Sequence, residues 1–268
     1  MKEITEYENG TFCWVELVAT NLVIAKDFYQ QLFGWTYRED SIGKDEHYTM
    51  IFKEGKEVGG MYAMRKEQEE VGMPAHWMSY VSVDDLEGTV KKAKELGSFP
   101  YIEAMDVGTA GRMACVHEPE GAIFSLWQAK DHLGIKVKGL HGTPSWFELA
   151  SNDAEKSQTF FKELFGWGTK VDELEEGKSY TLFTGASKAK ETKAGLLQMT
   201  EEWGAIPAHW MVYYTVESCD EAVTLATNIG GGVMLESTDI PKVGRFSVLQ
   251  DPQGGIFSVI EWAEGVLP

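Results

Sequence analysis

Four side chains that can do acid–base or ligand chemistry recur in the two halves of the chain. Glu16 and Glu148 each stand in a Trp-x-Glu-Leu sequence, and His76 and His209 each stand in Pro-Ala-His-Trp-Met. A carboxylate inside an apolar cavity has a raised pKa and can act as a general base. An imidazole can bind a metal, take up a proton or hydrogen-bond to a ligand. Glu16, Glu148, His76 and His209 are therefore the candidate catalytic residues.

Each candidate also has a structural interpretation, which stays open beside the chemical one. The two glutamates can instead form salt bridges with an arginine such as Arg112 or Arg245, which follow a glycine in each half. These arginines can equally pair with surface carboxylates or with an anionic ligand group. The two histidines follow a Pro-Ala loop, so each can hydrogen-bond a loop carbonyl.

The spacing of these residues reflects an internal duplication. Three segments recur in order at offsets of 132 or 133 residues: Phe33-Gly34-Trp35 at Phe165-Gly166-Trp167, Pro74–Met78 at Pro207–Met211, and Gly111-Arg112 at Gly244-Arg245. A chain of 268 residues is long enough for two domains. We expect one domain over residues 10–129 and a second over residues 144–263. Residues 130–143, with three glycines and no periodicity, are expected to be the linker.

The expected elements that position these residues follow one order. A strand at Phe12–Ala19 precedes a helix at Leu22–Phe33, whose apolar residues recur every three or four positions and which Gly34 ends. Three strands follow, and the order starts again at His76 with a strand, a helix from Val83 to Gly97 and three more strands. The second half repeats both units. Helices alternate with runs of strands, so the fold class is α+β.

These segments together resemble the glyoxalase/bleomycin-resistance/extradiol-dioxygenase group, the vicinal oxygen chelate superfamily. The resemblance rests on the following residues: Trp14-x-Glu16-Leu17, Phe28-Tyr29-x-x-Leu32-Phe33-Gly34-Trp35, Val83-Asp84-Asp85, Gly111-Arg112, Glu118-Pro119-x-Gly121, and their counterparts Trp146-x-Glu148-Leu149, Phe160-Phe161-x-x-Leu164-Phe165-Gly166-Trp167 and Asp251-Pro252-x-Gly254. It implies tandem glyoxalase-like domains. Each consists of two paired strand-helix-strand-strand-strand units that form a curved sheet around a cavity, with the helices outside.

In metal-using members of this group, the resemblance places a divalent ion on His or Glu ligands from the first, fourth, fifth and eighth strands of a domain. Counting from the motifs, the first, fifth and eighth positions fall on Trp14, Met78 and Ser125, and in the second half on Trp146, Met211 and Ser258. These side chains are poor ligands for such an ion. We therefore expect no metal and no cofactor.

Strand alternation then indicates what lines each cavity. If the former ligand positions face inward, the side chains two residues away on each strand face inward too. The expected ligand-binding residues are Trp14, Met78, Tyr80, Ser125 and Trp127 in the first half, and Trp146, Met211, Tyr213 and Ser258 in the second. An aromatic and thioether lining with a few polar groups is typical of a small-molecule pocket. Trp77 and Trp210 point the other way, toward the helices.

Composition limits the partners. The net charge is −18 and no basic run offsets it, which argues against nucleic acid and anionic membranes as partners. Three widely spaced cysteines, Cys13, Cys115 and Cys219, indicate neither a disulfide framework nor a zinc site, and a reducing cytoplasm is the expected location. The N-terminus is unlike a signal peptide, and no apolar run is long enough to span a membrane. The oligomeric state stays open.

The sequence favours a protein that binds a small organic metabolite or toxic compound in aromatic-lined cavities without a metal. The first alternative is a lyase, isomerase or dioxygenase whose divalent metal is held by residues such as His76, His209, Glu16 and Glu148. The second alternative is a structural or interaction module.

Overall fold

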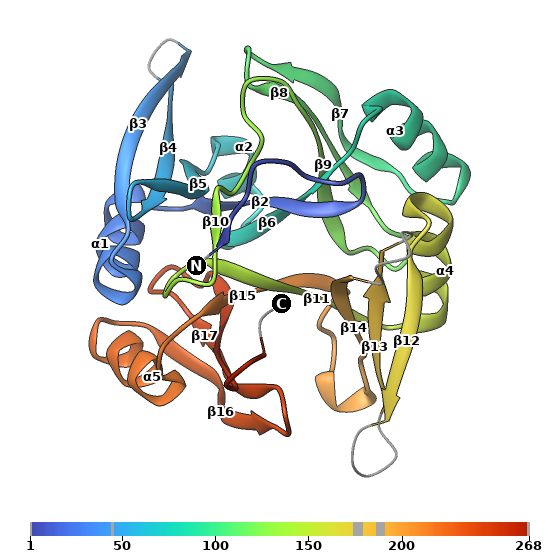
Figure 1. Ribbon diagram of the computed structural model, residues 1–268. Coiled ribbons are helices and arrows are strands. Elements are labelled where there is room, and N and C mark those ends of the chain that lie inside the picture. Colours follow the sequence, from blue (N-terminus) through green and yellow to red (C-terminus); the bar gives the residue numbers. More distant parts are fainter. Residues whose placement is uncertain (1, 44–45, 174–178, 186–190, 267–268) are drawn as a thin grey trace.

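Two eight-stranded curved sheets make up most of the protein (Figure 1). The computed structural model describes residues 2–43, 46–173, 179–185 and 191–266. The first sheet has the order β3-β4-β5-β2-β6-β9-β8-β7, and the second has the order β12-β13-β14-β11-β15-β18-β17-β16.

The strands of the first sheet are β2 (Thr11–Ala19), β3 (Thr36–Gly43), β4 (Glu46–Lys53), β5 (Lys56–Ala63), β6 (His76–Ser82), β7 (Pro100–Val107), β8 (Gly111–His117) and β9 (Ile123–Ala129). Those of the second sheet are β11 (Pro144–Ser151), β12 (Gly168–Glu173), β13 (Ser179–Thr184), β14 (Thr192–Gln198), β15 (His209–Thr215), β16 (Gly232–Ile240), β17 (Gly244–Gln250) and β18 (Ile256–Trp262). The longer helices are α1 (Leu22–Phe33), α3 (Leu86–Glu95), α4 (Ala154–Phe165) and α5 (Cys219–Asn228).

The strand directions confirm paired units in each sheet. In the first sheet, β2 runs antiparallel to β6, and each of these two strands runs parallel to the last strand of its own unit, β5 or β9. The second sheet repeats this pattern with β11 and β15 at its centre. The expected α+β fold, with two units per curved sheet, is therefore confirmed.

Local sequence explains why α1 spans the residues that periodicity predicts. The side chain of Asn21 accepts hydrogen bonds from the backbone N–H groups of Val23 and Ile24, which caps the N-terminus. Gly34 ends the helix with a left-handed φ of 66°, which glycine adopts without a steric penalty. Ala25, Phe28, Tyr29, Leu32 and Phe33 form its buried face.

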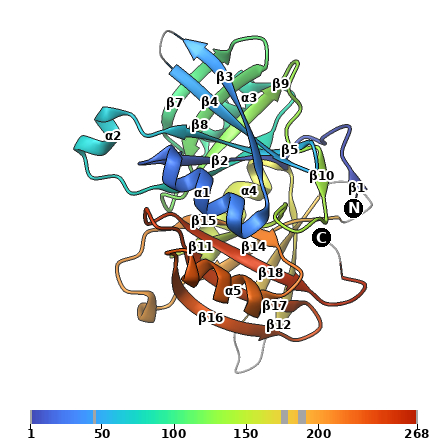
Figure 2. The same ribbon diagram turned by 90° about the vertical axis from the view of Figure 1, so that its left-hand side faces the viewer.

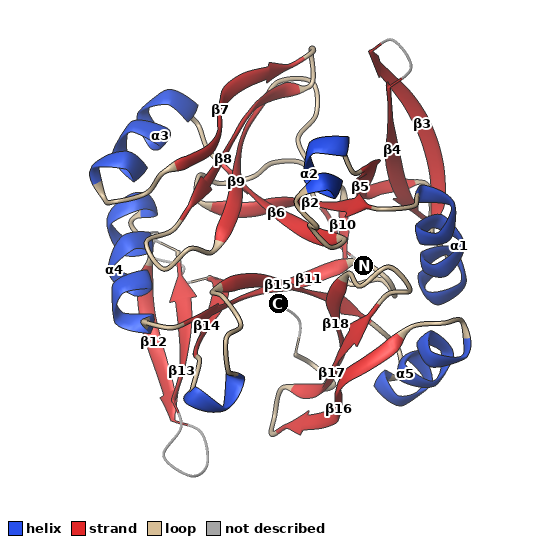
Figure 3. Cartoon of the chain, turned by 180° about the vertical axis from the view of Figure 1, so that it is seen from behind, coloured by secondary structure: helices blue, strands red, loops and turns tan. Residues whose placement is uncertain are grey.

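The two sheets pack back to back, with the helices beside their contact. Leu17 and Trp77 of the first sheet and Leu149 and Trp210 of the second belong to one hydrophobic core. Helix α1 lies beside α5 on one side of the molecule (Figure 2), and α3 lies beside α4 on the other (Figure 3). The opposite, concave faces of the sheets open away from each other (Figure 1).

Two equivalent hydrogen bonds join the halves. The indole Nε1 of Trp35 donates to the carbonyl of Gly142 at 2.8 Å, and that of Trp167 donates to the carbonyl of Gly10 at 3.0 Å. Trp35 and Trp167 are counterparts in the repeat, so the interface has approximate two-fold symmetry. Each half thus contributes one buried indole to bind the chain segment that precedes the other half's first long strand.

Four short elements were not predicted. Strands β1 (Lys2–Glu3) and β10 (Val137–Lys138) pair with each other, so the expected linker contains a strand. A short helix α2 (Lys66–Glu70) and a 3-10 turn η2 (Glu201–Trp203) precede the two Pro-Ala-His-Trp-Met segments. The cysteines are buried and unpaired. Among the described residues, no helix combines the length and the hydropathy needed to cross a membrane.

Candidate functional site

The concave face of each sheet carries the side chains that alternation predicts. Trp14, Tyr80 and Trp127 form a separate hydrophobic cluster with Met78 packed against it, and Met211 and Tyr213 form another with Trp146. Ser125 and Ser258 stand beside the two tyrosines in register and are fully buried. Whether these residues bind a ligand stays a prediction. A register shift between Phe12 and Trp14 also places Cys13 in the first cluster.

Glu16 lies at the centre of the first concave face and is bound by phenol groups rather than by a cation. The hydroxyl of Tyr80 donates to Glu16 Oε1 at 2.8 Å. The side chain of Tyr48 also hydrogen-bonds to this carboxyl group. The hydroxyl of Tyr48 in turn accepts a hydrogen bond from Trp14 Nε1 at 2.9 Å. The result is a Trp–Tyr–Glu–Tyr network drawn from β2, β4 and β6.

The second sheet contains the same network. Tyr213 donates to Glu148 Oε1 at 2.8 Å, and Tyr180 donates to Glu148 Oε2 at 2.6 Å. Trp146 Nε1 donates to the hydroxyl of Tyr180 at 3.1 Å. The two copies agree in every residue type and every partner, so this constellation is a property of the repeat unit.

A glycine makes room for the network in each sheet. Gly60 lies opposite Glu16 on the parallel strand β5, and Gly195 lies opposite Glu148 on β14. A Cβ atom at Gly60 would overlap the hydroxyl of Tyr48, and one at Gly195 would overlap the hydroxyl of Tyr180. No side chain can therefore project from these fourth-strand positions while the tyrosines stay in place.

Burial sets the acid–base properties of the network. Desolvation raises the pKa of Glu16 and of Glu148, although the tyrosine hydroxyls that hydrogen-bond to each carboxyl group oppose this shift. Burial also raises the pKa of Tyr80 and of Tyr213 well above its ordinary value, so both phenols keep their protons. Each site thus combines a carboxyl group that binds a proton more readily than usual with phenols that donate hydrogen bonds.

The raised pKa values predict how stability depends on pH. An unfolded glutamic acid has a pKa of about 4.3, whereas Glu16 and Glu148 have higher pKa values in the folded state. Protonation of these two carboxyl groups therefore stabilises the fold at low pH, and this contribution is lost as pH rises. In the double variant Glu16→Gln/Glu148→Gln this loss is absent. The free energy of unfolding of the variant should therefore rise relative to the wild type above about pH 4.5, by at most about 1.4 kcal/mol per pH unit for each carboxyl. Urea unfolding followed by circular dichroism across this range measures the difference, and a pH-independent difference would contradict the prediction.

The two histidines of the repeated Pro-Ala-His-Trp-Met segments each contact a carbonyl of their own loop. Nδ1 of His76 lies 2.9 Å from the carbonyl oxygen of Pro74, and Nδ1 of His209 lies 2.8 Å from that of Pro207. These contacts fix the rings against the loops that enter β6 and β15. Trp77, the next residue, is buried on the convex side, as alternation predicts.

The two arginines do not pair with the buried glutamates. Arg112 forms salt bridges with Glu87 and Asp106, and Arg245 forms them with Asp220 and Asp239. Strand β8, which carries Arg112, is separated from β2 by β9 and β6. The expectation of a Glu–Arg pair is wrong for this geometric reason, and tyrosine hydroxyls take the place of the guanidinium.

The positions at which the family resemblance would place a divalent ion do not fit one here. Trp14 Nε1 is a hydrogen-bond donor and is engaged by Tyr48. The hydroxyl of Ser258 donates to Met211 Sδ, and the fourth-strand position is a glycine. Within the described part of the chain, no three His, Cys, Asp or Glu side chains come together as a metal site. His76, His209, Glu16 and Glu148 are not brought into such a group.

Tyr48 and Tyr180 are the site residues that sequence reasoning missed. Both lie in predicted strands, but their contact with the glutamates depends on which strand pairs with which. One signal was present: the two tyrosines are 132 residues apart, the same offset that separates Glu16 from Glu148. Two side chains that recur at one offset are candidates for a shared site.

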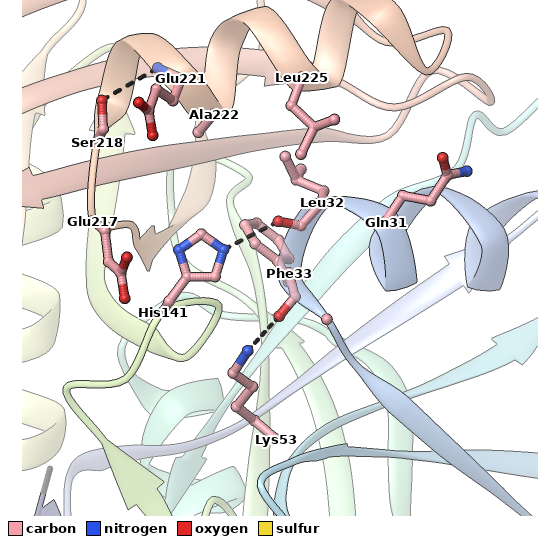
Figure 4. A pocket seen from close by; sticks show the side chains of 11 residues that line it. Gln31, Leu32, Phe33, Lys53, His141, Glu217, Ser218, Glu221, Ala222 and Leu225 are labelled. Atoms are coloured by element: carbon pink, nitrogen blue, oxygen red, sulfur yellow. Dashed lines mark hydrogen bonds between the residues drawn. The ribbon is translucent and has the colours of Figure 1, made fainter.

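A crevice of about 370 Å³ lies away from both concave faces (Figure 4). It is formed where the C-terminal end of α1 meets the N-terminal end of α5. Lys53 Nζ donates to the carbonyl of Phe33 at 2.7 Å, and His141 Nε2 lies 3.1 Å from the carbonyl oxygen of Leu32. Both side chains are therefore engaged in closing the end of α1, and the crevice belongs to the contact between the halves.

Two tandem curved sheets, each built of paired units, are consistent with the glyoxalase fold. The model of the Glyoxalase/Bleomycin resistance protein/Dioxygenase superfamily matches residues 11–126 and 143–258, and the chain belongs to this superfamily. Members of the superfamily bind small-molecule substrates.

Two relatives are similar to this chain over nearly their whole length. The chain is 36% identical to "Putative glyoxylase CFP32" of Mycobacterium tuberculosis, over 97% of this chain and 98% of that protein. It is 30% identical to the anthracycline biosynthesis protein DnrV of Streptomyces peucetius, over 98% and 97% of the two chains.

Two solved structures resemble the fold at low sequence identity. The Mn(II)-bound glyoxalase from Novosphingobium aromaticivorans gives a TM-score of 0.63 at 14% identity, with 94% of this chain and 82% of that chain covered. The 2,3-dioxygenase LapB from Pseudomonas sp. KL28 gives a TM-score of 0.63 at 15% identity, with 98% and 95% covered. At this identity the likeness concerns the fold alone.

Proposed function

We propose that the protein binds a small organic molecule on the concave face of its sheet through the Trp–Tyr–Glu–Tyr network, without a bound metal. The observation that carries this proposal is the network itself, present twice with the same residue types and partners. A buried carboxyl group with two phenol donors and an indole costs free energy to desolvate. Its presence is accounted for if the repeat unit recognises a polar group of a ligand in at least one half.

The surroundings of the network support an organic ligand. Aromatic rings and thioethers, such as Trp127, Met78 and Met211, offer apolar contact area around one polar centre. The names of two relatives, a glyoxylase and an anthracycline biosynthesis protein, both point to organic compounds. Indole, thioether and hydroxyl groups occupy the positions at which the resemblance would place metal ligands. Because these groups bind divalent ions weakly, they support ligand recognition without a metal.

Native mass spectrometry after incubation with a metabolite extract tests the proposal. We expect one or more organic molecules to stay bound to the wild type. In the double variant Glu16→Gln/Glu148→Gln, retention should fall at least about tenfold. This factor corresponds to about 1.4 kcal/mol, the smallest contribution expected of a buried charge-assisted hydrogen bond. The variant keeps the size and hydrogen-bonding shape of the side chain. If no molecule is retained and Trp14→Ala changes nothing, a structural or interaction module becomes the better description.

Metal content gives a separate prediction. Protein purified without added metal is expected to contain less than about 0.1 divalent ion per chain, and dialysis against EDTA should leave ligand retention unchanged, because indole, thioether and hydroxyl groups bind such ions weakly. Elemental analysis measures the content. Near-stoichiometric zinc, nickel, manganese or iron that is lost in His76→Ala or His209→Ala would instead support the divalent-metal lyase, isomerase or dioxygenase.

A further inference from the structure

The two concave faces share their network but differ around it. Tyr62 and Arg65 follow Gly60 on and after β5, whereas Leu197 and Thr200 take the matching positions after Gly195. Likewise Cys115 stands beside Ser125, and Val248 stands beside Ser258. The first face is therefore the more polar of the two.

The matching serines show the clearest difference. The hydroxyl of Ser258 donates to Met211 Sδ, so its hydrogen-bonding capacity is used within the second sheet. The hydroxyl of Ser125 is fully buried, and the weakly hydrogen-bonding thiol of Cys115 is its one partner among the described residues. A thiol is a poor hydrogen-bond partner, so it satisfies the hydroxyl only weakly. Ser125 thus has spare hydrogen-bonding capacity beside Tyr80 at the centre of the first face.

His132, from the segment between the halves, adds an unused polar atom to the first face. Its ring stands edge-on to Trp14, with centroids 4.5 Å apart and planes at 86°, and lies 6.0 Å from the ring of Trp127. Nδ1 faces Glu57 Oε2 at 3.5 Å. Nε2 is buried without a hydrogen-bond partner in the described structure. The residue 133 positions further along is Gly265, so the second half has no equivalent imidazole.

The partner of Nδ1 decides what Nε2 can do. His132 holds the pKa of Glu57 below its ordinary value, chiefly through their side-chain hydrogen bond, so Glu57 carries a negative charge. A carboxylate next to Nδ1 favours the tautomer with the proton on Nδ1. In that tautomer Nε2 is an acceptor. The first face therefore offers an unused acceptor at His132, beside Trp14 and Trp127, and a weakly satisfied hydroxyl at Ser125, beside Tyr80.

We infer that the first concave face is the ligand site and that the second is its structural copy. The ligand has an apolar body that packs on Trp14 and Trp127 and bears hydrogen-bond donors, such as hydroxyl or amino groups, that His132 Nε2, Ser125 and Glu16 accept. This inference rests on the proposed function. It assigns ligand binding to the first half, includes His132 from the linker in the site, and specifies a ligand with hydrogen-bond donors.

The duplication supplies matched variants for the test. The probe is 2-naphthol, a planar apolar body with one hydroxyl donor, and its control is 2-methoxynaphthalene, which lacks the donor. Isothermal titration calorimetry should give one 2-naphthol per wild-type chain. 2-Methoxynaphthalene should bind at least about tenfold more weakly, which corresponds to about 1.4 kcal/mol for one lost hydrogen bond. Because the single hydroxyl proton goes to one acceptor, Glu16→Gln or His132→Phe should weaken 2-naphthol at least tenfold more than Glu148→Gln does. The exposed Glu236→Gln variant controls for handling.

The outcomes separate this inference from the proposed function. Binding that Glu148→Gln weakens as much as, or more than, both Glu16→Gln and His132→Phe overturns the assignment to the first half while the proposed function stands. Absence of 2-naphthol binding to the wild type overturns the donor-bearing ligand class, and the metabolite extract then tests the proposed function by itself.

A second measurement needs no ligand. Ser125→Ala removes a buried hydroxyl whose one described partner is the weakly bonding Cys115 thiol, so the melting temperature should stay nearly the same or rise. Ser258→Ala removes a hydroxyl that has a partner and should lower the melting temperature by about 2–4 °C. Equal losses in the two variants would show that Ser125 is fully satisfied in the folded protein, which would overturn its assignment as a spare ligand contact.

Discussion

Replacing Trp77 with alanine is expected to lower the free energy of unfolding by about 3–5 kcal/mol, the usual cost of deleting a large buried aromatic side chain. The Trp77 ring packs against Tyr29 of α1 at 5.5 Å and against Tyr214 of the second sheet at 5.4 Å. Its Nε1 donates to the hydroxyl of Tyr29, which donates to Asp251 of the second half at 3.0 Å. The variant therefore loses packing and one step of a hydrogen-bond chain between the halves.

The position of Trp77 also predicts the form of the unfolding transition. Since its partners come from both halves, the loss should lower one cooperative transition rather than the stability of the first half alone. Urea unfolding followed by tryptophan fluorescence and by circular dichroism should give coincident curves in the wild type. Trp203→Ala, at a partly exposed ring on η2, serves as the control and should cost less than about 1 kcal/mol. A similar small cost for Trp77→Ala would contradict the interface described above.

Local signals account for the parts of the fold that the sequence predicted well. The helix Leu22–Phe33 is defined by its own periodicity and by caps at its two ends, so no distant contact is needed to place it. Alternation along β2 and β6 likewise placed Trp14 and Trp77 on opposite faces. These features depend on residues within a few positions of one another.

Features that depend on pairing between distant segments were not predictable in the same way. The contact of Tyr48 with Glu16 requires β4 to pair with β5 and β5 with β2, and the register of those pairs is not written in any single strand. Arg112 was assigned to Glu16 as a possible partner because sequence gives no lateral distance between strands. The contact of Trp77 with Tyr214 depends on the back-to-back packing of the halves, which periodicity does not reveal.

A tyrosine, rather than the repeated histidine, contacts the buried glutamate in each half. The repeated Pro-Ala-His-Trp-Met segment suggests a histidine site, but the histidine ring is bound to its own loop. The residue two positions after the methionine, Tyr80 or Tyr213, donates to the buried glutamate. The repeated segment therefore serves the site by setting the register of β6 and β15, which brings these phenols opposite the carboxyl groups.

Gly60→Ala is expected to have the second large effect, because it tests whether the network needs the space that glycine provides. The new Cβ atom would overlap the Tyr48 hydroxyl, so the ring must leave its place. Trp14 and Glu16 then each lose a partner inside a buried site. Overpacking commonly costs about 1–3 kcal/mol and an unsatisfied buried polar group about 1–3 kcal/mol, so we expect a loss of about 2–4 kcal/mol in the free energy of unfolding.

The double variant Gly60→Ala/Tyr48→Ala separates the clash from the effect of an added methyl group on the strand. If the overlap with Tyr48 is the cause, the cost of the double variant is clearly less than the sum of the single costs, since neighbouring residues that share one space are coupled. Additive costs would show that Gly60 acts through the backbone alone. Gly195→Ala should cost as much stability, because its Cβ meets Tyr180 in the same way. Only Gly60→Ala, however, should abolish 2-naphthol binding, so comparing the two variants distinguishes a network that stabilises the fold from one that also binds a ligand.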